Sequence, residues 1–231
     1  GFQVVAPDLR GFCAGARPIG VEQYHLEEYA QDVLAIADGM GHGDQPFHLM
    51  ATSIGATIAW WIAAKNPERV ATLACINIPH PGALAEGRAN TEARDDGQRE
   101  KFSYITEAAR DGNERTMFDG MLAVQGVSAE ESEPYRTALD SDEALRAVFN
   151  FYRALPLAAG ERLDPVPMPT LFIWPTGSKN VANASIDANA NWVTGPYRLE
   201  IVADVHQPAL QAAPERMTPL LLGHLAEHAA P

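Results

Sequence analysis

Short hydrophobic runs alternate along the chain with longer stretches in which apolar residues recur at the spacing of an α-helix. The runs that predict strands cover 2–7, 47–51, 70–78, 169–174 and 197–202. Helices are expected over 26–40, from Ala56 to the break at Asn66 and Pro67, over 186–193 and over 213–229. Nearly continuous apolar strands that alternate with helices are typical of a parallel sheet covered on both faces. The pattern therefore predicts an α/β fold with a mostly parallel sheet flanked by helices.

The stretch 82–159 breaks this alternation, because it is charged and helical and contains no strand pattern. A helical insertion between the strands of a parallel sheet predicts a cap or lid, although ordinary packing helices would give the same pattern. We therefore expect a core domain in two parts, 1–81 and 160–231, with a helical cap or lid over 82–159.

One polar residue stands at the junction between a predicted strand and a predicted helix. Ser53 follows the run 47–51 and precedes the helix, with the small residues Ala51 and Gly55 two positions away on either side. A sharp strand-to-helix turn needs small neighbours and would lift the Ser53 hydroxyl above the edge of the sheet. The backbone N–H of Ile54 and the helix N-terminus would then point to a spot where an oxyanion can sit. The alternative is a serine that merely caps the helix.

Composition and charge narrow the choice of partners. The formal net charge is −13 and the isoelectric point is near 4.9, which argues against binding to nucleic acids or anionic membranes. Cys13 and Cys75 have no metal-binding or redox spacing, and no apolar run approaches the ~20 residues of a membrane span. We expect a small apolar molecule as substrate, with no metal, cofactor, nucleic acid or membrane.

The chain has no initial methionine and begins directly in a strand pattern. A cytoplasmic location is expected. The alternative of a signal segment that preceded this sequence and was removed stays open. For macromolecular partners two alternatives stay open: an N-terminal fragment of the same protein, or a second copy of the chain in a homo-oligomer.

Several stretches together resemble the α/β-hydrolase superfamily, closest to its epoxide hydrolase and haloalkane dehalogenase branch. They read VVAPDLRGF, FHLMATSIGATIAWWIAAKNPERV, NIPHPGAL, FNFYRALP, PTLFIW and HQPALQAAPERMTPLLLGHL, and they run from the first residues to the last helix. The resemblance implies an α/β-hydrolase fold with a lid. It also implies roles for single residues: Ser53 as nucleophile, His206 as general base, and Tyr152 as a lid tyrosine that donates a hydrogen bond to the substrate, or else only packs the lid.

The nucleophile position departs from that branch. The branch usually carries an aspartate in G-H-D-W-G-G, whereas the same positions here, 51–56, read A-T-S-I-G-A. An aspartate opens an epoxide through an ester intermediate, but a serine would form a stable ether. With a carboxylic ester, a serine instead forms an acyl-enzyme that water can hydrolyse.

The position of the family's acid is also changed. Ser178 stands where the carboxylate is usual, and Asn77 occupies the alternative place after the strand that follows the Ser53 helix. An asparagine can orient an imidazole but cannot supply charge to its protonated form. The strand and turn with which the family usually begins are missing as well. Either this segment lies elsewhere, which we expect, or the sheet pairs differently.

The sequence thus predicts a serine hydrolase of a carboxylic ester or lactone, with Ser53 as nucleophile, His206 as base and Ile54 at the oxyanion site. Two alternatives remain. One is a non-hydrolytic protein that binds a small ligand on the hydrolase scaffold, and the other is an altered epoxide hydrolase-like protein.

Overall fold

The computed structural model of the protein describes residues 1–91 and 98–228, which divide into two compact units. The helical unit comprises residues 1–41 and 104–161, and the sheet unit comprises residues 42–103 and 162–231.

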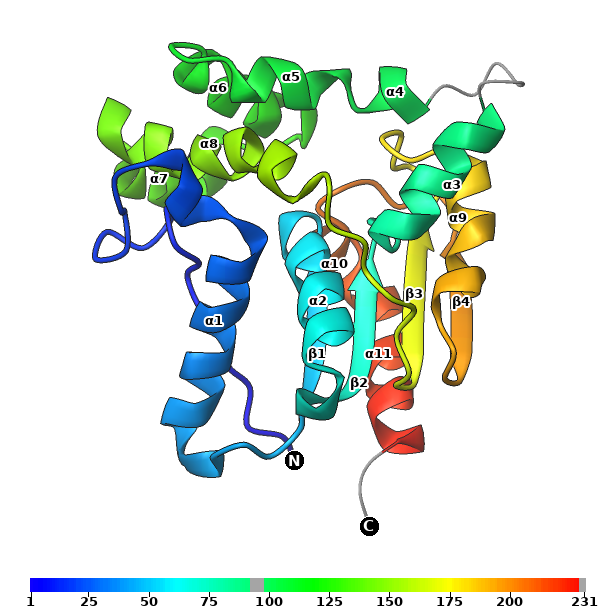
Figure 1. Ribbon diagram of the computed structural model, residues 1–231. Coiled ribbons are helices and arrows are strands. Elements are labelled where there is room, and N and C mark those ends of the chain that lie inside the picture. The colour runs from blue at the N-terminus through cyan, green and yellow to red at the C-terminus, as the bar shows by residue number, and fades with distance from the viewer. Residues whose placement is uncertain (92–97, 229–231) are drawn as a thin grey trace. The chain divides into compact units, whose positions relative to one another are not determined.

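The sheet unit carries every strand of the described residues. The strands are β1 (Phe47–Thr52), β2 (Val70–Ile76), β3 (Thr170–Pro175) and β4 (Tyr197–Val202), in the order β1-β2-β3-β4 (Figure 1). Its helices are α2 (Ile54–Lys65), η3 (Pro67–Arg69), α3 (Pro81–Thr91), α4 (Gln98–Lys101), α9 (Asn183–Asp187), η5 (Ala188–Trp192), α10 (Ala209–Ala212) and α11 (Pro214–Glu227). All neighbouring strands pair in parallel, so the predicted fold class is confirmed.

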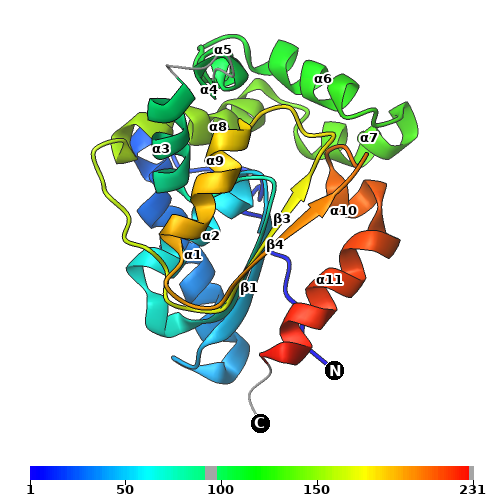
Figure 2. The ribbon, with the colours of Figure 1, turned by 90° about the vertical axis from the view of Figure 1, so that its right-hand side faces the viewer.

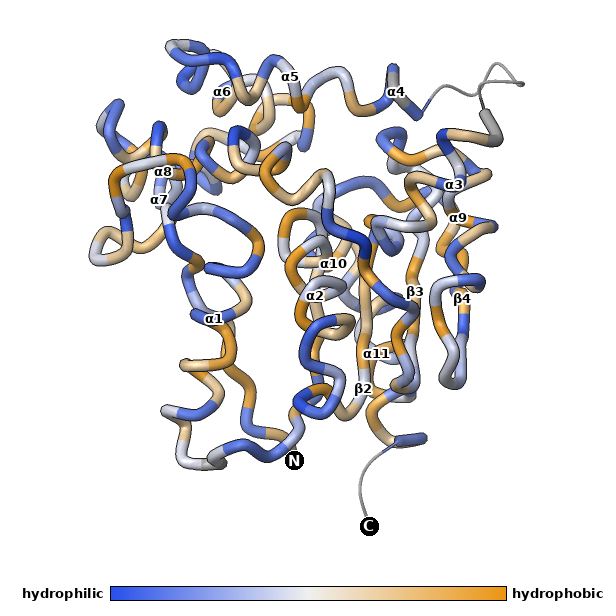
Figure 3. Tube along the Cα trace, in the orientation of Figure 1, coloured by the Kyte–Doolittle hydropathy of each residue, from blue (hydrophilic) through white to orange (hydrophobic). Residues whose placement is uncertain are grey.

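Helices cover both faces of this sheet, as its hydrophobic pattern predicted. Figure 2 views the sheet from the side, with α2, α3 and α9 on one face and α10 and α11 on the other. On the face toward α10 and α11, Ile76 and Ile173 of the sheet pack with Met217 and Leu221 in a buried hydrophobic cluster. The central strands β2 and β3 are almost fully buried, whereas β1 and β4 are partly exposed. Figure 3 shows the resulting hydrophobic path along β2.

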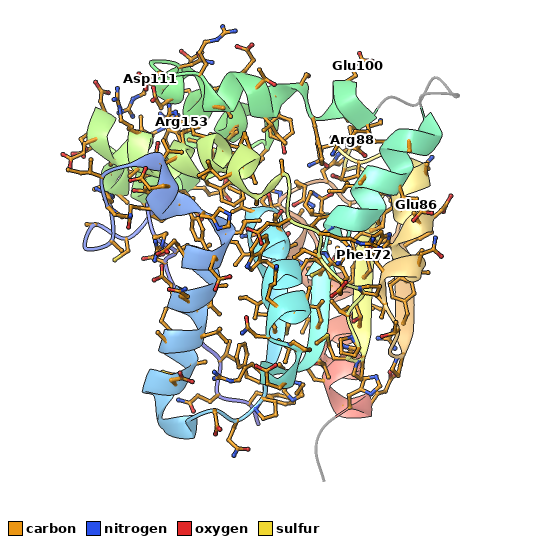
Figure 4. All side chains as sticks on the ribbon, in the orientation of Figure 1. Glu86, Arg88, Glu100, Asp111, Arg153 and Phe172 are labelled. Atoms are coloured by element: carbon orange, nitrogen blue, oxygen red, sulfur yellow. The ribbon has the colours of Figure 1, made fainter. Side chains whose placement is uncertain are left out.

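The helical unit contains only helices and loops among its described residues. Its elements are η1 (Val21–Tyr24), α1 (Leu26–Ala37), η2 (Asp38–His42, whose last residue opens the sheet unit), α5 (Ser103–Ala109, entered from the sheet unit), α6 (Glu114–Val124), α7 (Ala129–Ala138), α8 (Asp142–Ala154) and η4 (Leu155–Ala158). Helix α8 is its centre, because most of its residues are buried. Arg153 on α8 pairs with Glu114 and lies 3.7 Å from Asp111 (Figure 4).

The N-terminal expectation was wrong: residues 2–7 form no strand. They are exposed, and the Val4 side chain is 82% accessible to solvent. The ladder of described strands consists of β1 to β4 alone, and an apolar run becomes a strand only when a neighbour pairs its backbone N–H and C=O groups. A hydrophobic run is therefore not sufficient evidence for a strand.

The compact units also divide the chain differently from the expected core over 1–81 and 160–231 and lid over 82–159. Residues 1–41 group with α8, while α3 packs closely on α9 and η5 in the sheet unit. A Cβ on Gly82 would lie 2.4 Å from the Trp192 ring, and one on Gly87 would lie 2.0 Å from Ser185 Oγ. These two glycines allow α3 to approach so closely. Glu86 completes the contact by accepting a hydrogen bond from the Trp192 indole at 3.2 Å (Figure 4).

A buried histidine stands between β2 and α3. The His80 ring stacks on Trp192 at a centroid distance of 4.9 Å and meets the edge of Trp60 at 5.3 Å. Its Nδ1 accepts the backbone N–H of Gly82 at 3.0 Å, and its Nε2 has no hydrogen-bond partner among the described residues. Burial lowers the pKa of His80 from 6.5 to about 4, against a smaller opposing effect of the Asp164 carbonyl.

We expect this ring to make folding pH-dependent. Because the neutral imidazole is favoured in the folded state, the unfolded chain binds the extra proton between pH 6.5 and about 4. The stabilisation is therefore complete above pH 6.5 and is lost as the pH falls toward 4, by up to about 3 kcal/mol. Urea unfolding at several pH values measures it.

The matched variant is His80→Phe, which keeps an aromatic ring but cannot take up a proton. The variant should lose less stability than the wild type between pH 6.5 and 4. His224, whose pKa burial likewise lowers to about 4, leaves a residual dependence. Equal slopes in the two proteins would refute the role of His80.

Candidate active site

Three residues at one edge of the sheet have an unfavourable backbone conformation. Ser53 follows β1 with φ 52°, Asn77 follows β2 with φ 76°, and Asp204 lies just beyond β4 with φ 58°. Positive φ costs a non-glycine residue on the order of 1–3 kcal/mol and is concentrated at functional sites. Because the strands are parallel, all three residues lie at the carboxyl edge, where ligands bind in open α/β sheets. This edge is the candidate active site.

Ser53 occupies the predicted strand-to-helix turn. Its backbone, at φ 52° and ψ −126°, leaves β1 and enters α2 within a single residue, and its side chain is exposed. The side chain makes no capping hydrogen bond to α2, so the alternative of a simple helix cap fails. A Cβ on Gly55 would lie 3.6 Å from the Ala51 methyl, an ordinary van der Waals contact, so the two small residues lie close together beside the turn and an alanine at 55 would also fit.

The amide of Ile54 is placed as an anion donor beside Ser53. Ile54 is the first residue of α2, and the first N–H groups of a helix have no acceptor within the helix. The positive end of the helix dipole adds to this field. An oxyanion formed next to Ser53 would therefore meet a free N–H, although the role of Ile54 stays a prediction.

The loops that follow β3 and β4 are joined by a continuous set of hydrogen bonds. Thr176 N donates to Val202 O at 3.0 Å, Asp204 N to Thr176 Oγ1 at 2.9 Å, Gly177 N to Val205 O at 2.9 Å, and His206 Nδ1 contacts Gly177 O at 3.2 Å. These contacts extend the β3–β4 ladder beyond the ends of the strands. The His206 imidazole is the last group in this series of hydrogen bonds.

The loop before His206 is also anchored to the core. The Val205 side chain is 4% exposed and belongs to the cluster beneath α10 and α11. Arg216 on α11 donates a hydrogen bond to the Ala203 carbonyl at 2.7 Å. With Val205 pointing inward, the neighbouring side chain of His206 is exposed at the carboxyl edge.

The two candidates for a third catalytic residue lie against each other. Ser178 Oγ donates to Asn77 Oδ1 at 2.5 Å and also lies 2.7 Å from Asn180 Oδ1. Asn77 and Ser178 are buried, and in the described structure neither one hydrogen-bonds to His206. Among the described residues, the hydrogen-bond partner of the His206 ring is a backbone carbonyl and not a carboxylate. A catalytic role for Asn77 or Ser178 stays a prediction.

Comparison with known proteins decides the family. The model of the alpha/beta hydrolase fold family matches residues 1–207. This chain belongs to that family.

Individual relatives of this α/β hydrolase share about a quarter of its residues. Epoxide hydrolase 3 of Xenopus tropicalis is 26% identical over 98% of this chain and 65% of its own length. AB hydrolase superfamily protein YfhM of Bacillus subtilis is 26% identical over 75% of this chain and 63% of its own length. The chain therefore spans less than two thirds of these curated relatives.

A solved structure shows the same fold. An epoxide hydrolase from metagenomes of hot environments superposes with a TM-score of 0.80 at 23% identity, over 96% of this chain and 81% of that one. The sequence motifs suggested a relation to the epoxide hydrolase branch of the family. The relatives confirm this relation.

Tyr152 lies in the helical unit of this α/β hydrolase. It is on α8, it is 8% exposed, and its ring meets the edge of Tyr104 at 6.3 Å. Burial raises the pKa of its hydroxyl, which therefore stays protonated and able to donate. A place for Tyr152 in the substrate pocket stays a prediction.

Sequence reasoning missed Gly177, because a residue without a side chain gives no chemical signal. Its importance comes from the approach of two loops, which the sequence does not show. Among the described residues, none of the helices combines the length and the apolar character that a membrane span requires, and no group of His, Cys, Asp or Glu side chains could hold a metal ion.

The strain at Ser53 leads to a prediction about stability. Ser53→Gly should raise the free energy of unfolding by about 1 kcal/mol, because glycine adopts positive φ freely and this relief exceeds its greater entropy loss. Ser53→Ala removes the same hydroxyl but keeps the strain, so it should stay within about 0.5 kcal/mol of the wild type. Parallel urea titrations measure both variants. Equal stability of the two would show that the turn is not strained.

Proposed function

We propose that this α/β hydrolase cleaves a carboxylic ester or lactone through an acyl-enzyme on Ser53. The observation that carries the proposal is the strained turn at the carboxyl edge, in which Ser53, with an exposed side chain, directly precedes Ile54, the first residue of α2. A nucleophile beside a preorganised anion donor is the arrangement that acyl transfer requires.

The chemistry follows from the groups at this edge. Ser53 Oγ attacks the ester carbonyl carbon while His206 Nε2 takes up the hydroxyl proton. The Ile54 N–H stabilises the oxyanion of the tetrahedral intermediate. Collapse of the intermediate breaks the C–O bond, and the leaving alkoxide receives the proton from His206. Water, deprotonated in turn by His206, releases the acid and regenerates Ser53.

His206 must extend across the edge to reach Ser53. His206 follows β4 and Ser53 follows β1, and the strands β2 and β3 lie between them. At the ~4.8 Å spacing of a sheet, β1 and β4 are therefore roughly 14 Å apart. The contact of His206 Nδ1 with Gly177 O joins the His206 loop to the loop after β3, and β3 is the neighbour of β4 on the way to β1. This direction supports the pairing.

The lack of a carboxylate sets the expected rate. Loss of the acid from a serine triad lowers kcat by on the order of 10⁴, largely because the imidazole takes the wrong tautomer. Here a backbone carbonyl contacts Nδ1 of His206 at 3.2 Å and supplies no full charge. Turnover should be slow but measurable.

A fluorophosphonate probe tests the proposal directly. Ser53 should be labelled in the folded chain, and His206→Ala should slow labelling on the order of 10³-fold, because the hydroxyl then has no base. The exposed Ser103 supplies the control, since Ser103→Ala should label like the wild type. Peptide mapping locates the adduct. An intact, folded sample whose Ser53 stays unlabelled would end the proposal and favour a non-hydrolytic ligand-binding role.

A second candidate is an altered epoxide hydrolase, which the name of the Xenopus tropicalis relative favours. Ser53→Asp would supply the carboxylate that opens an epoxide as an ester. If this candidate holds, the variant should gain the mass of an aryl epoxide as a covalent ester, and His206 should then direct its hydrolysis. A variant that folds but forms no adduct would exclude this candidate.

A further inference from the structure

The imidazole of His206 has one fixed neighbour at its second nitrogen. Nδ1 lies 3.2 Å from the carbonyl oxygen of Gly177, and no side chain of the described residues bonds to this ring. A carbonyl oxygen can only accept a hydrogen bond, so Nδ1 must carry the proton. In the neutral ring Nε2 then keeps its lone pair, which is the form that a general base needs.

A serine or asparagine side chain can hold an imidazole by a hydrogen bond, but it selects the tautomer less strictly than a carbonyl does. The Ser178 hydroxyl and the Asn77 carboxamide can each donate as well as accept, so either would tolerate both tautomers. In the structure they bond to each other at 2.5 Å. The Gly177 carbonyl is therefore the group with both the position and the chemistry to select one tautomer.

Gly177 is held in place by a reciprocal contact. Its N–H donates to the Val205 carbonyl at 2.9 Å, while its own carbonyl accepts from the His206 ring. Val205 is anchored in the core, so the pair fixes the ring relative to the sheet. Two hydrogen bonds between the same short segments also resist rotation of the loop better than one.

The absence of a side chain at residue 177 makes this contact possible. A Cβ there would lie 2.5 Å from Val205 O and 2.6 Å from His206 Nδ1, closer than real Cβ contacts. The backbone of Gly177 does not have positive φ, so the requirement is steric and not conformational. Any larger residue would push the two loops apart.

We infer that Gly177 is a positioning residue, whose backbone carbonyl takes over from an acidic side chain the task of orienting His206 as the base. The inference rests on the proposed function for its catalytic meaning. In this way a serine hydrolase that has no carboxylate as third catalytic residue keeps its histidine in the productive tautomer.

Nuclear magnetic resonance of the full chain with isotope-labelled histidine tests the inference without relying on activity. At a pH where His206 is neutral, the nitrogen shifts should show a protonated Nδ1 and a bare Nε2, the reverse of the preference of free histidine. With Gly177 carbonyl-labelled, a scalar coupling across the hydrogen bond should join Nδ1 to that carbonyl carbon. A protonated Nε2, or a missing coupling, would overturn the inference.

A variant pair links the tautomer to catalysis. Gly177→Ala should shift His206 toward the Nε2-protonated form and slow fluorophosphonate labelling of Ser53 at least about tenfold. Gly223→Ala is the matched control, because a Cβ at Gly223 meets nothing within 4 Å, and it should change neither readout. Unchanged shifts and rate in Gly177→Ala would also overturn the inference.

The outcomes separate the two proposals. If Gly177→Ala does not fold, the wild-type shifts and coupling still decide the inference. If wild-type Ser53 is not labelled while His206 shows the protonated Nδ1 and the coupling, the ester chemistry fails and the orienting contact stands. If labelling succeeds but Nε2 is protonated, the inference alone fails.

Discussion

The parallel pairing of four strands is the constraint on which the rest of this structure depends. It brings the residues that follow β1, β2, β3 and β4 to a single edge, although they lie more than 150 residues apart in sequence at the extremes, Ser53 and His206. Between β3 and β4 the ladder continues beyond the strands through Thr176 and Gly177 to the imidazole. The position of the histidine is thus a consequence of strand register.

Strain and burial are distributed along that edge in different ways. Ser53 bears an unfavourable backbone conformation with an exposed side chain, which suits a group that must meet a substrate. Asn77 also has positive φ, which asparagine adopts more readily than serine, but it is 1% exposed and bonded to Ser178. The two uncharged side chains of Asn77 and Ser178 bond to each other in the buried loops after β2 and β3, the strands that lie between β1 and β4. A carboxylate there would need a partner for its charge, whereas these amide and hydroxyl groups satisfy each other.

Neutral groups recur elsewhere in the sheet unit. His80 is enclosed by Trp60 and Trp192, and its ring stays uncharged because burial disfavours the protonated form. The same stack fixes the chain at the point where it leaves β2 for α3, and Gly82 lets the helix close over Trp192. Trp60, His80 and Trp192 thus form a buried aromatic cluster just beyond β2, and the burial that keeps the His80 ring neutral also makes the fold sensitive to acid.

The sequence by itself determined the α/β class, four of the five expected strands and the place of Ser53 between a strand and a helix. Local hydrophobic periodicity and the small residues around the turn carry that information. Only the tertiary structure decided that residues 2–7 form no strand, because pairing depends on a neighbour, and that α3 belongs with the sheet. It also decided what touches His206: a carbonyl has no signature in the sequence, and Gly177 is recognised only once two loops are seen to meet.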